Sequence, residues 1–147
     1  MLAVAAQKSA SSPTVMRPGT PADWDYVGAT WRRHYRRRCA AARRVPERLY
    51  EVEQRALIGL ILSRAQVVCA VAATEPDLIV GYIVLEQPAV HWIHVKAGFR
   101  GFGLARRLAA EATGALYYTH DVEHAAALWQ RLGLVLSFNP YRAWSVG

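Results

Sequence analysis

Apolar side chains recur at helical spacing shortly after the start of the chain. Four of them fall on one stripe of a helix, and these are Trp24, Val27, Trp31 and Tyr35. The preceding stretch, Thr20–Asp23, offers a capping residue, a proline suited to the first helical turn and an aspartate that can reach back. The pattern therefore predicts an amphipathic helix that begins after Thr20 and buries its aromatic stripe.

A second helical pattern follows a break at Cys39–Arg44. It opens at Pro46, ends near Arg64 and has a wide apolar face. The residues of that face are Leu49, Val52, Ala56, Leu57, Leu60 and Ile61. We expect this face to pack against the core.

Seven runs rich in β-branched, aromatic and other apolar residues predict strands. They are Thr14–Arg17, Gln66–Ala73, Leu78–Glu86, Ala89–Val95, Ala115–Thr119, Leu134–Phe138 and Tyr141–Val146. A turn at Glu75–Asp77 makes a hairpin of the second and third runs, and two further helices are expected, over 104–112 and from Asp121 to Leu132. Because antiparallel strands come first and a strand–helix–strand crossover follows, the pattern predicts a mixed α/β (α+β) sheet.

The 147 residues suit one domain, and 53% of them are hydrophobic, which is enough to bury a core. We expect a loose polar tail at residues 1–13 and a single domain over 14–147. No apolar run approaches the length of a membrane span, and the first ten residues do not have the pattern of a secretory signal. Cys39 and Cys69 are too few for a disulfide scaffold or a structural zinc site, so we expect free thiols, no metal and a cytoplasmic protein.

The basic charge is concentrated in one segment. Residues 32–48 hold eight arginines and a single acid, Glu47, so this segment alone equals the formal net charge of +7. A local surface of this kind favours polyanions, which makes nucleic acid a candidate partner through Arg32–Arg48. The alternative is a solvated helix face. In either case we expect these arginines not to determine the fold.

The segment most informative about chemistry runs from Val95, at the end of a predicted strand, into the next helix. Its centre, Arg100–Ala105, reads RGFGLA. Glycines let several backbone N–H groups point into one space, and neighbouring arginines add charge, so the segment suits a pyrophosphate. It is not a P-loop, because Gly103 is followed by Leu104, and it is not a dinucleotide fingerprint, because Arg106 stands where that motif has glycine or alanine.

This segment resembles the acetyl-CoA loop of the GCN5-related N-acetyltransferases, in which a strand ending in valine is followed by [RQ]-x-x-G-x-[GA] at the start of a helix. The residues that match are Val95, Arg100, Gly103 and Ala105. Ala125–Leu134 resembles the family's later LYxxLGF segment, and the family's order of elements covers about residues 14–146. The resemblance implies a mostly antiparallel sheet of six to seven strands with about four helices, splayed beside Val95.

The resemblance also implies acetyl-CoA as the cofactor, with direct transfer of an acetyl or other acyl group to an amine on a small molecule or a protein. The residues carried over to cofactor binding are Ile93, Val95, Arg100, Gly101, Phe102, Gly103, Leu104, Ala105 and Arg106. No metal and no membrane are implied, and an oligomer is compatible. Two alternatives stay open: a nucleic-acid-directed protein of this fold that uses the arginine segment, and a CoA-binding module without catalysis.

The expected catalytic groups depart from the family pattern. Trp129 stands where the family commonly has a tyrosine acid, and an indole does not give up a proton at neutral pH. A base is still needed to deprotonate the attacking ammonium. His91 is the first candidate, because strand alternation puts it on the face of Val95, and aralkylamine acetyltransferases resemble this chain in placing a catalytic histidine at that spacing. Glu86 is the second candidate. His94 is expected on the opposite face unless a bulge resets the alternation, and a structural role is the alternative for either histidine.

Overall fold

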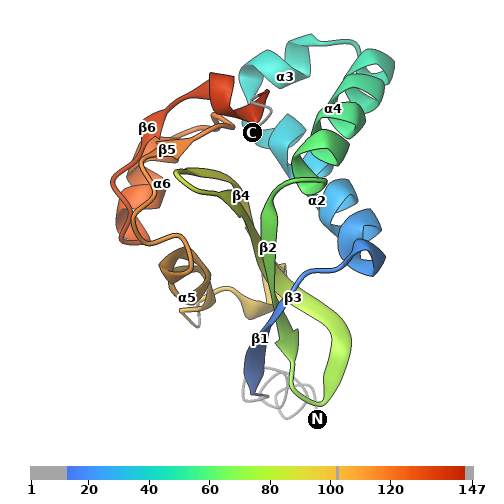
Figure 1. Cartoon of the computed structure of the whole chain (residues 1–147). Coiled ribbons are helices and arrows are strands. Elements are labelled where there is room, and N and C mark those ends of the chain that lie inside the picture. The colour runs from blue at the N-terminus through green and yellow to red at the C-terminus, as the bar shows by residue number, and fades with distance from the viewer. Residues whose placement is uncertain (1–12, 102, 145–147) are drawn as a thin grey trace.

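The computed structural model of the chain describes residues 13–101 and 103–144. The predicted tail therefore lies outside the described residues except for Pro13, and so do residues 145 and 146 of the last predicted strand. Within the described part, one six-stranded sheet is flanked by five α-helices (Figure 1). This confirms the mixed α/β class with six strands, and the helix count is one higher than expected.

The strands lie side by side in chain order. Their bounds are β1 Thr14–Pro18, β2 Gln66–Ala72, β3 Glu75–Glu86, β4 Ala89–Val95, β5 Tyr117–Tyr118 and β6 Ser137–Phe138. The pairings from β1 to β4 are antiparallel, and those of β4 with β5 and β5 with β6 are parallel. The predicted order, antiparallel strands followed by a crossover, is thus confirmed.

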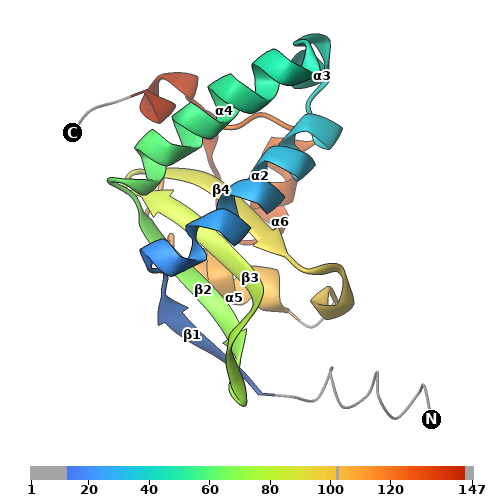
Figure 2. The ribbon, with the colours of Figure 1, turned by 90° about the vertical axis from the view of Figure 1, so that its right-hand side faces the viewer.

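The helices form one layer on each side of the sheet. Their bounds are α2 Trp24–Arg38, α3 Ala40–Arg44, α4 Glu47–Leu62, α5 Leu104–Ala110 and α6 Ala125–Arg131, with short 3-10 helices η1 Pro21–Asp23, η2 Ala97–Phe99 and η3 Pro140–Ala143. Figures 1 and 2 show α2 and α4 on one face of the sheet and α5 and α6 on the other. None of the helices in the described residues has the length and apolar character that crossing a membrane requires.

The start of α2 is held by the carboxylate that the sequence indicated. Asp23 accepts a hydrogen bond from the backbone N–H of Thr20 at 2.8 Å, and Arg17 donates to both of its oxygens at 2.8 and 2.9 Å. The Arg17 guanidinium, as hydrogen-bond donor, holds the pKa of Asp23 below its usual value. This pair joins β1 to α2. Of the predicted stripe, Val27 and Trp31 are fully inaccessible, and Trp24 and Tyr35 are partly buried against the core.

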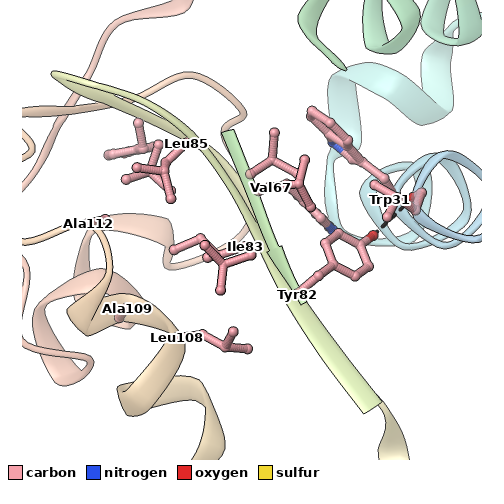
Figure 3. Packing of buried hydrophobic residues seen from close by; sticks show 14 of the residues in the cluster. Trp31, Val67, Tyr82, Ile83, Leu85, Leu108, Ala109 and Ala112 are labelled. Carbon is pink, nitrogen blue, oxygen red and sulfur yellow. Dashed lines mark hydrogen bonds between the residues drawn. The ribbon is translucent and has the colours of Figure 1, made fainter. Parts of the chain in front are cut away.

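The core lies on both faces of β3 (Figure 3). Ile83 points to the α5 side, where Leu108 packs, and Tyr82 points to the α2 side. The Tyr82 hydroxyl donates to the carbonyl oxygen of Val27 at 3.0 Å and lies 2.7 Å from the hydroxyl of Thr30. These bonds satisfy a phenol that is wholly buried, so Tyr82 fixes α2 on the sheet.

The predicted apolar face of the second helix is largely wrong. Leu49 and Val52 of α4 are 51% and 63% exposed, and Leu60 is also exposed. Leu57 and Ile61 are buried as predicted, and the other buried residues of the helix are Tyr50, Ile58 and Leu62. Apolar residues occur on almost every side of this helix, so its pattern alone did not identify the side that packs on the sheet.

Three predicted boundaries also need correction. The break at Cys39–Arg44 contains the short helix α3, and the turn predicted at Glu75–Asp77 is part of β3. Asp121 does not cap a helix, because α6 begins at Ala125 after His124, which has a left-handed backbone with φ of 57°.

The last predicted strand is not a strand where the structure describes it. Pro140–Ala143 forms the 3-10 helix η3 instead. The side chain of Asn139 accepts a hydrogen bond from the backbone N–H of Tyr141 at 3.2 Å, and the proline occupies the first helical position.

Candidate active site

The sheet opens between its fourth and fifth strands. In the described part of the chain, β4 pairs with β5 only through Ala89 and Val90, which lie opposite Tyr117 and Tyr118. From there to Val95, the edge of β4 has no strand beside it. The separation is the splay that the resemblance implied beside Val95.

This opening holds a cavity of about 480 Å3, here called the main cavity. Its walls come from the end of α2, the end of β4, the segment before α5, and α5 and α6. The lining residues are His34, Arg37, Arg38, Trp92, Ile93, His94, Val95, Arg100, Ala105, Leu128 and Leu132. Four consecutive residues, 92–95, take part, so the cavity borders both faces of β4 at its free edge.

A smaller cavity of about 180 Å3, here called the loop pocket, adjoins the main cavity. It is lined by Val95, Phe99, Arg100, Gly101, Gly103, Leu104, Ala105, Arg106 and Leu132, and four of these residues also line the main cavity. All described residues of the predicted cofactor site therefore line one of the two cavities. Phe102 lies outside the described residues.

The loop pocket is built around two glycines with left-handed backbones. Gly101 has φ of 87° and Gly103 has φ of 73°, a region that other residues adopt at a cost. A Cβ atom added to either glycine would meet no atom within 4 Å, so the space beside this backbone is open. The first N–H groups of α5 have no partner inside the helix, and together with the side chain of Arg106 they are donors of the kind that a phosphate group accepts from.

The register of β4 overturns the side predicted for His91. Val84 lies opposite Trp92, but the next residue of β3, Leu85, lies opposite Val90. His91 is thus the extra residue of a β-bulge, and the bulge resets the alternation. Val95 lies on the α5 face, whereas Trp92 stacks on Trp31 of α2.

His94 lies on the α2 face, opposite to Val95 as expected, and it lines the main cavity, whereas His91 lines neither cavity. His94 lies opposite Tyr82 in the sheet, and its ring lies 5.0 Å from that of His34. Burial, with the charges of His34 and Arg100 adding to it, lowers the pKa of His94 to about 4. His94 is therefore uncharged at neutral pH.

His91 belongs to a buried chain of hydrogen bonds. Its Nε2 lies 2.8 Å from Glu86, and its Nδ1 lies 2.8 Å from the hydroxyl of Thr119. Thr119 also lies 3.0 Å from Nδ1 of His120, and Glu86 accepts from Arg64 at 2.7 Å. Burial lowers the pKa of His91 although Glu86 acts in the opposite direction, so a neutral ring donates from Nε2 to Glu86 and accepts from Thr119. Both ring nitrogens are occupied, which describes a structural histidine.

The arginine segment divides by what its guanidinium groups contact. Arg32 pairs with Glu51 at 3.1 Å, and Arg43 donates to the backbone carbonyl of Arg37. Arg36 donates to the carbonyl oxygens that end α3, those of Ala42 at 3.3 Å and Val45 at 3.0 Å. Arg36 thus contacts the fold directly, and the expectation that these arginines do not determine the fold stays a prediction about stability.

Arg37 and Arg38 differ from the arginines just described, because both line the main cavity. The carbonyl oxygen of Arg38 also accepts a hydrogen bond from the N–H of Glu123 at 3.1 Å, which ties the end of α2 to the segment before α6. Sequence analysis missed His34, Arg37 and Arg38 as site residues. The charge of this segment was visible in the sequence. That these three side chains lie beside residues 92–95 depends on contacts between segments far apart in the chain.

Trp129 and the two cysteines, which the sequence analysis singled out, lie away from the cavities. Trp129 is buried in the core on α6 and lines neither cavity, so no titratable group faces the site from that position. Cys39 and Cys69 are both buried and unpaired. Within residues 13–101 and 103–144, no three His, Cys, Asp or Glu side chains gather so that they could hold a metal ion.

Comparison with known proteins identifies the fold. The chain is similar to apo YjaB from Escherichia coli, with 21% identity, a TM-score of 0.58, and coverage of 82% of this chain and 81% of that one. It is similar to the GCN5-related N-acetyltransferase from Rhodopseudomonas palustris, with 21% identity, a TM-score of 0.51 and the same coverage. It is also similar to yncA, a putative acetyltransferase from Salmonella typhimurium solved with its cofactor acetyl-CoA, with 16% identity, a TM-score of 0.54, and coverage of 82% and 76%.

The protein thus has the fold of the GCN5-related N-acetyltransferases. No protein-family model matches the sequence, and no curated protein matches it. At these identities the structural likeness establishes the architecture, and the chemistry has to be argued from the residues of the two cavities.

Proposed function

We propose that this protein is an acyl-CoA-dependent N-acyltransferase that moves an acetyl group directly to an amine. The observation that carries the proposal is the continuity of the loop pocket with the main cavity at the free edge of β4. The loop pocket offers donors and arginines for a pyrophosphate, and the unpaired edge of β4 offers main-chain groups to the amide-containing arm of CoA. The complex of yncA with acetyl-CoA supports the choice of cofactor.

Acetyl-CoA would supply the acyl group as a thioester. The attacking ammonium must give up one proton before its nitrogen can form the C–N bond, and a second proton passes from nitrogen to the sulfur as the C–S bond breaks. His94 is the proposed base for the first proton, because it lines the main cavity and is neutral at neutral pH. Glu86 and His91, the candidates from sequence, are proposed instead to hold the bulge of β4 in place.

The proposal is tested by introducing a carboxylate into the loop pocket. Gly103→Glu should abolish acetyl-CoA binding in calorimetry, because its charge opposes the phosphates and its backbone favours glycine. Gly98→Glu is the matched control, since Gly98 lies in η2 just before this turn, lines neither cavity and has open space around it. Equal affinity in the Gly103→Glu variant and the wild type would overturn the cofactor assignment.

A second candidate function is a CoA-binding module without catalysis. The buried indole of Trp129, where the family resemblance places a proton donor, favours it. The two functions separate by turnover: the module would bind acetyl-CoA with Gly103-dependent affinity but release no free thiol with any amine.

A further inference from the structure

The lining of the main cavity is strongly cationic. Arg37 and Arg38 line it from α2, Arg100 lines it from the opposite wall, and no carboxylate is among its lining residues within the described chain. Glu123 lies close enough to Arg38 to raise the pKa of that guanidinium, but it does not line the cavity. Three fixed positive charges therefore face a single space.

Because the three arginines line one cavity, their charges repel one another. Burial lowers the pKa of Arg38, and the charge of Arg100 lowers it further. Burial also lowers the pKa of His34, with contributions from Arg33, Arg37 and Arg100. Like charges held together in a partly enclosed space cost free energy, and a bound anion would remove that cost.

Within the described residues, the guanidinium groups of Arg37 and Arg38 are held by no hydrogen bond or ion pair, unlike those of two neighbouring arginines. Arg32 and Arg36 of the same helix are held by Glu51 and by the carbonyl oxygens that end α3, whereas Arg37 and Arg38 reach the cavity wall. Arg32 and Arg36 are four residues apart on one side of α2, and Arg37 and Arg38 follow them at its end, so the helix presents one pair of arginines to the protein and one pair to the cavity.

We propose that the acceptor of this enzyme is a small amine that itself carries a carboxylate or phosphate, and that Arg37 and Arg38 bind that anionic group. The inference rests on the proposed function and names its substrate class. An acceptor that brings only an ammonium would enter a cavity of its own charge, whereas an anionic group on the same molecule compensates for it. His94 lines the same cavity as these arginines, and its ring lies 5.0 Å from that of His34 on the same helix as the arginines, so an amine anchored in this way would lie near the proposed base.

The first experiment measures acetyl-CoA binding by calorimetry in the wild type and in the double variant Arg37→Gln/Arg38→Gln. The control is Arg44→Gln/Arg48→Gln, which removes two exposed arginines of the same segment that line neither cavity. We expect all three proteins to bind acetyl-CoA with the same affinity. A loss of affinity confined to the Arg37/Arg38 variant would overturn the inference, because these arginines would then hold phosphates of the cofactor. Absence of binding in the wild type would instead overturn the proposed function.

The second experiment compares amines that differ only in their anionic group. The pairs are O-phosphoethanolamine with ethanolamine, and phenylalanine with phenethylamine, which separate phosphate from carboxylate. We expect kcat/KM at least tenfold higher for the anionic member of one pair, and loss of that preference in Arg37→Gln/Arg38→Gln but not in the control variant. Equal or better turnover of the neutral members, or an unchanged preference in the variant, would overturn the inference.

The third experiment reads binding without turnover. In the complex with CoA, O-phosphoethanolamine and phenylalanine are titrated while the ring protons of His34 and His94 are followed by NMR. A bound anion should shift these signals and raise the pKa of both rings, and Arg37→Gln/Arg38→Gln should remove the effect. Absence of any shift with either compound would overturn the inference even if no acceptor amine had been found.

Discussion

The guanidinium of Arg100 donates from Nε to the main-chain carbonyl oxygen of Val95, at a distance of 3.0 Å. Both residues line the main cavity and the loop pocket, so the bond lies where the two cavities meet. It holds the arginine beside the free edge of β4 and leaves the remaining guanidinium nitrogens to face a ligand. In the proposed complex, this side chain would face both the phosphates and the acyl-bearing arm, because it lines both cavities.

Replacing Arg100 should therefore weaken cofactor binding. We expect Arg100→Ala to lower the affinity for CoA about tenfold or more, because hydrogen bonds from a charged group are typically worth about 1.5–3 kcal/mol. The loss should shrink at high salt, since screening weakens the wild-type interaction. Calorimetry at two salt concentrations measures both effects. Arg48→Ala, on the exposed side of α4, is the control and should bind as the wild type does.

The bulge of β4 predicts different consequences for its two histidines. His94→Gln should lower turnover by about 10²–10⁴ while CoA binding is unchanged, as is typical for loss of a general base. His91→Gln should mainly lower the free energy of unfolding, because it disturbs the bonds to Glu86 and Thr119. Steady-state rates with an accepted amine and urea denaturation of both variants separate the roles. A larger loss of turnover at His91 would return the base to the position indicated by the sequence.

Acid should destabilise the protein in a window set by its buried histidines. Burial lowers the pKa of His94 to about 4 and that of His120 to about 3, against 6.5 for an exposed histidine. Below about pH 6.5 the unfolded chain therefore binds protons that the folded protein does not, so the free energy of unfolding falls as the pH falls. Each such histidine contributes about 1.4 kcal/mol per pH unit between its two pKa values.

Urea unfolding at pH 7.5, 6 and 5 measures this dependence. His94→Gln should reduce the slope below pH 6.5, because the unfolded chain then has one fewer proton to bind. His124→Asn, which replaces an exposed histidine with a residue that tolerates the left-handed backbone, should leave the slope as it is. A slope that does not change in the His94→Gln variant would show that this imidazole is not held neutral by the fold.

Arg36 should be the arginine of its segment that most affects stability. It donates to Ala42 and Val45 and lies 5.0 Å from the ring centre of Tyr50, so it joins α2 to α3 and α4. We expect Arg36→Ala to lower the free energy of unfolding by about 1–2 kcal/mol, and the exposed Arg33→Ala to change it by less than about 0.5 kcal/mol. Comparing the urea midpoints of the two variants checks this. Equal midpoints would mean that the hydrogen bonds of Arg36 in the folded protein are no more favourable than those its side chain makes to water in the unfolded chain.

The parts of the fold that could be predicted are those determined by neighbouring residues. Thr20 and Asp23 cap a helix through contacts within one turn, and the hairpin of β2 and β3 follows from two adjacent strands. The loop pocket was also accessible, because Gly101 and Gly103 form their turn locally and the motif that contains them is contiguous. The Asn139–Pro140 pair carried a local signal too, that of a capped helical turn, which the alternation of apolar residues concealed.

The parts that could not be predicted depend on residues far apart in the chain. The bulge at His91 exists because Val90 and Trp92 satisfy different partners on β3, and nothing in the alternation of β4 marks the extra residue. The inward side of α4 is decided by where the sheet lies, since apolar residues such as Leu49 and Ile58 occupy several sides of that helix. The role of Arg37 depends on the meeting of α2 with β4 and α6, which only the fold brings about.

The alternation along the free edge of β4 has a consequence for how two reactants would meet. Ile93 and Val95 face α5, Trp92 and His94 face α2, and all four line one cavity. A cofactor held from the α5 side and an acceptor held from the α2 side would therefore approach the reacting centre through separate entrances and meet at the rim of the sheet. A molecule that joined the two covalently would have to straddle this rim. Substitution of α2 side chains could then change which amine is accepted without changing the affinity for the cofactor, which would bind from the α5 side.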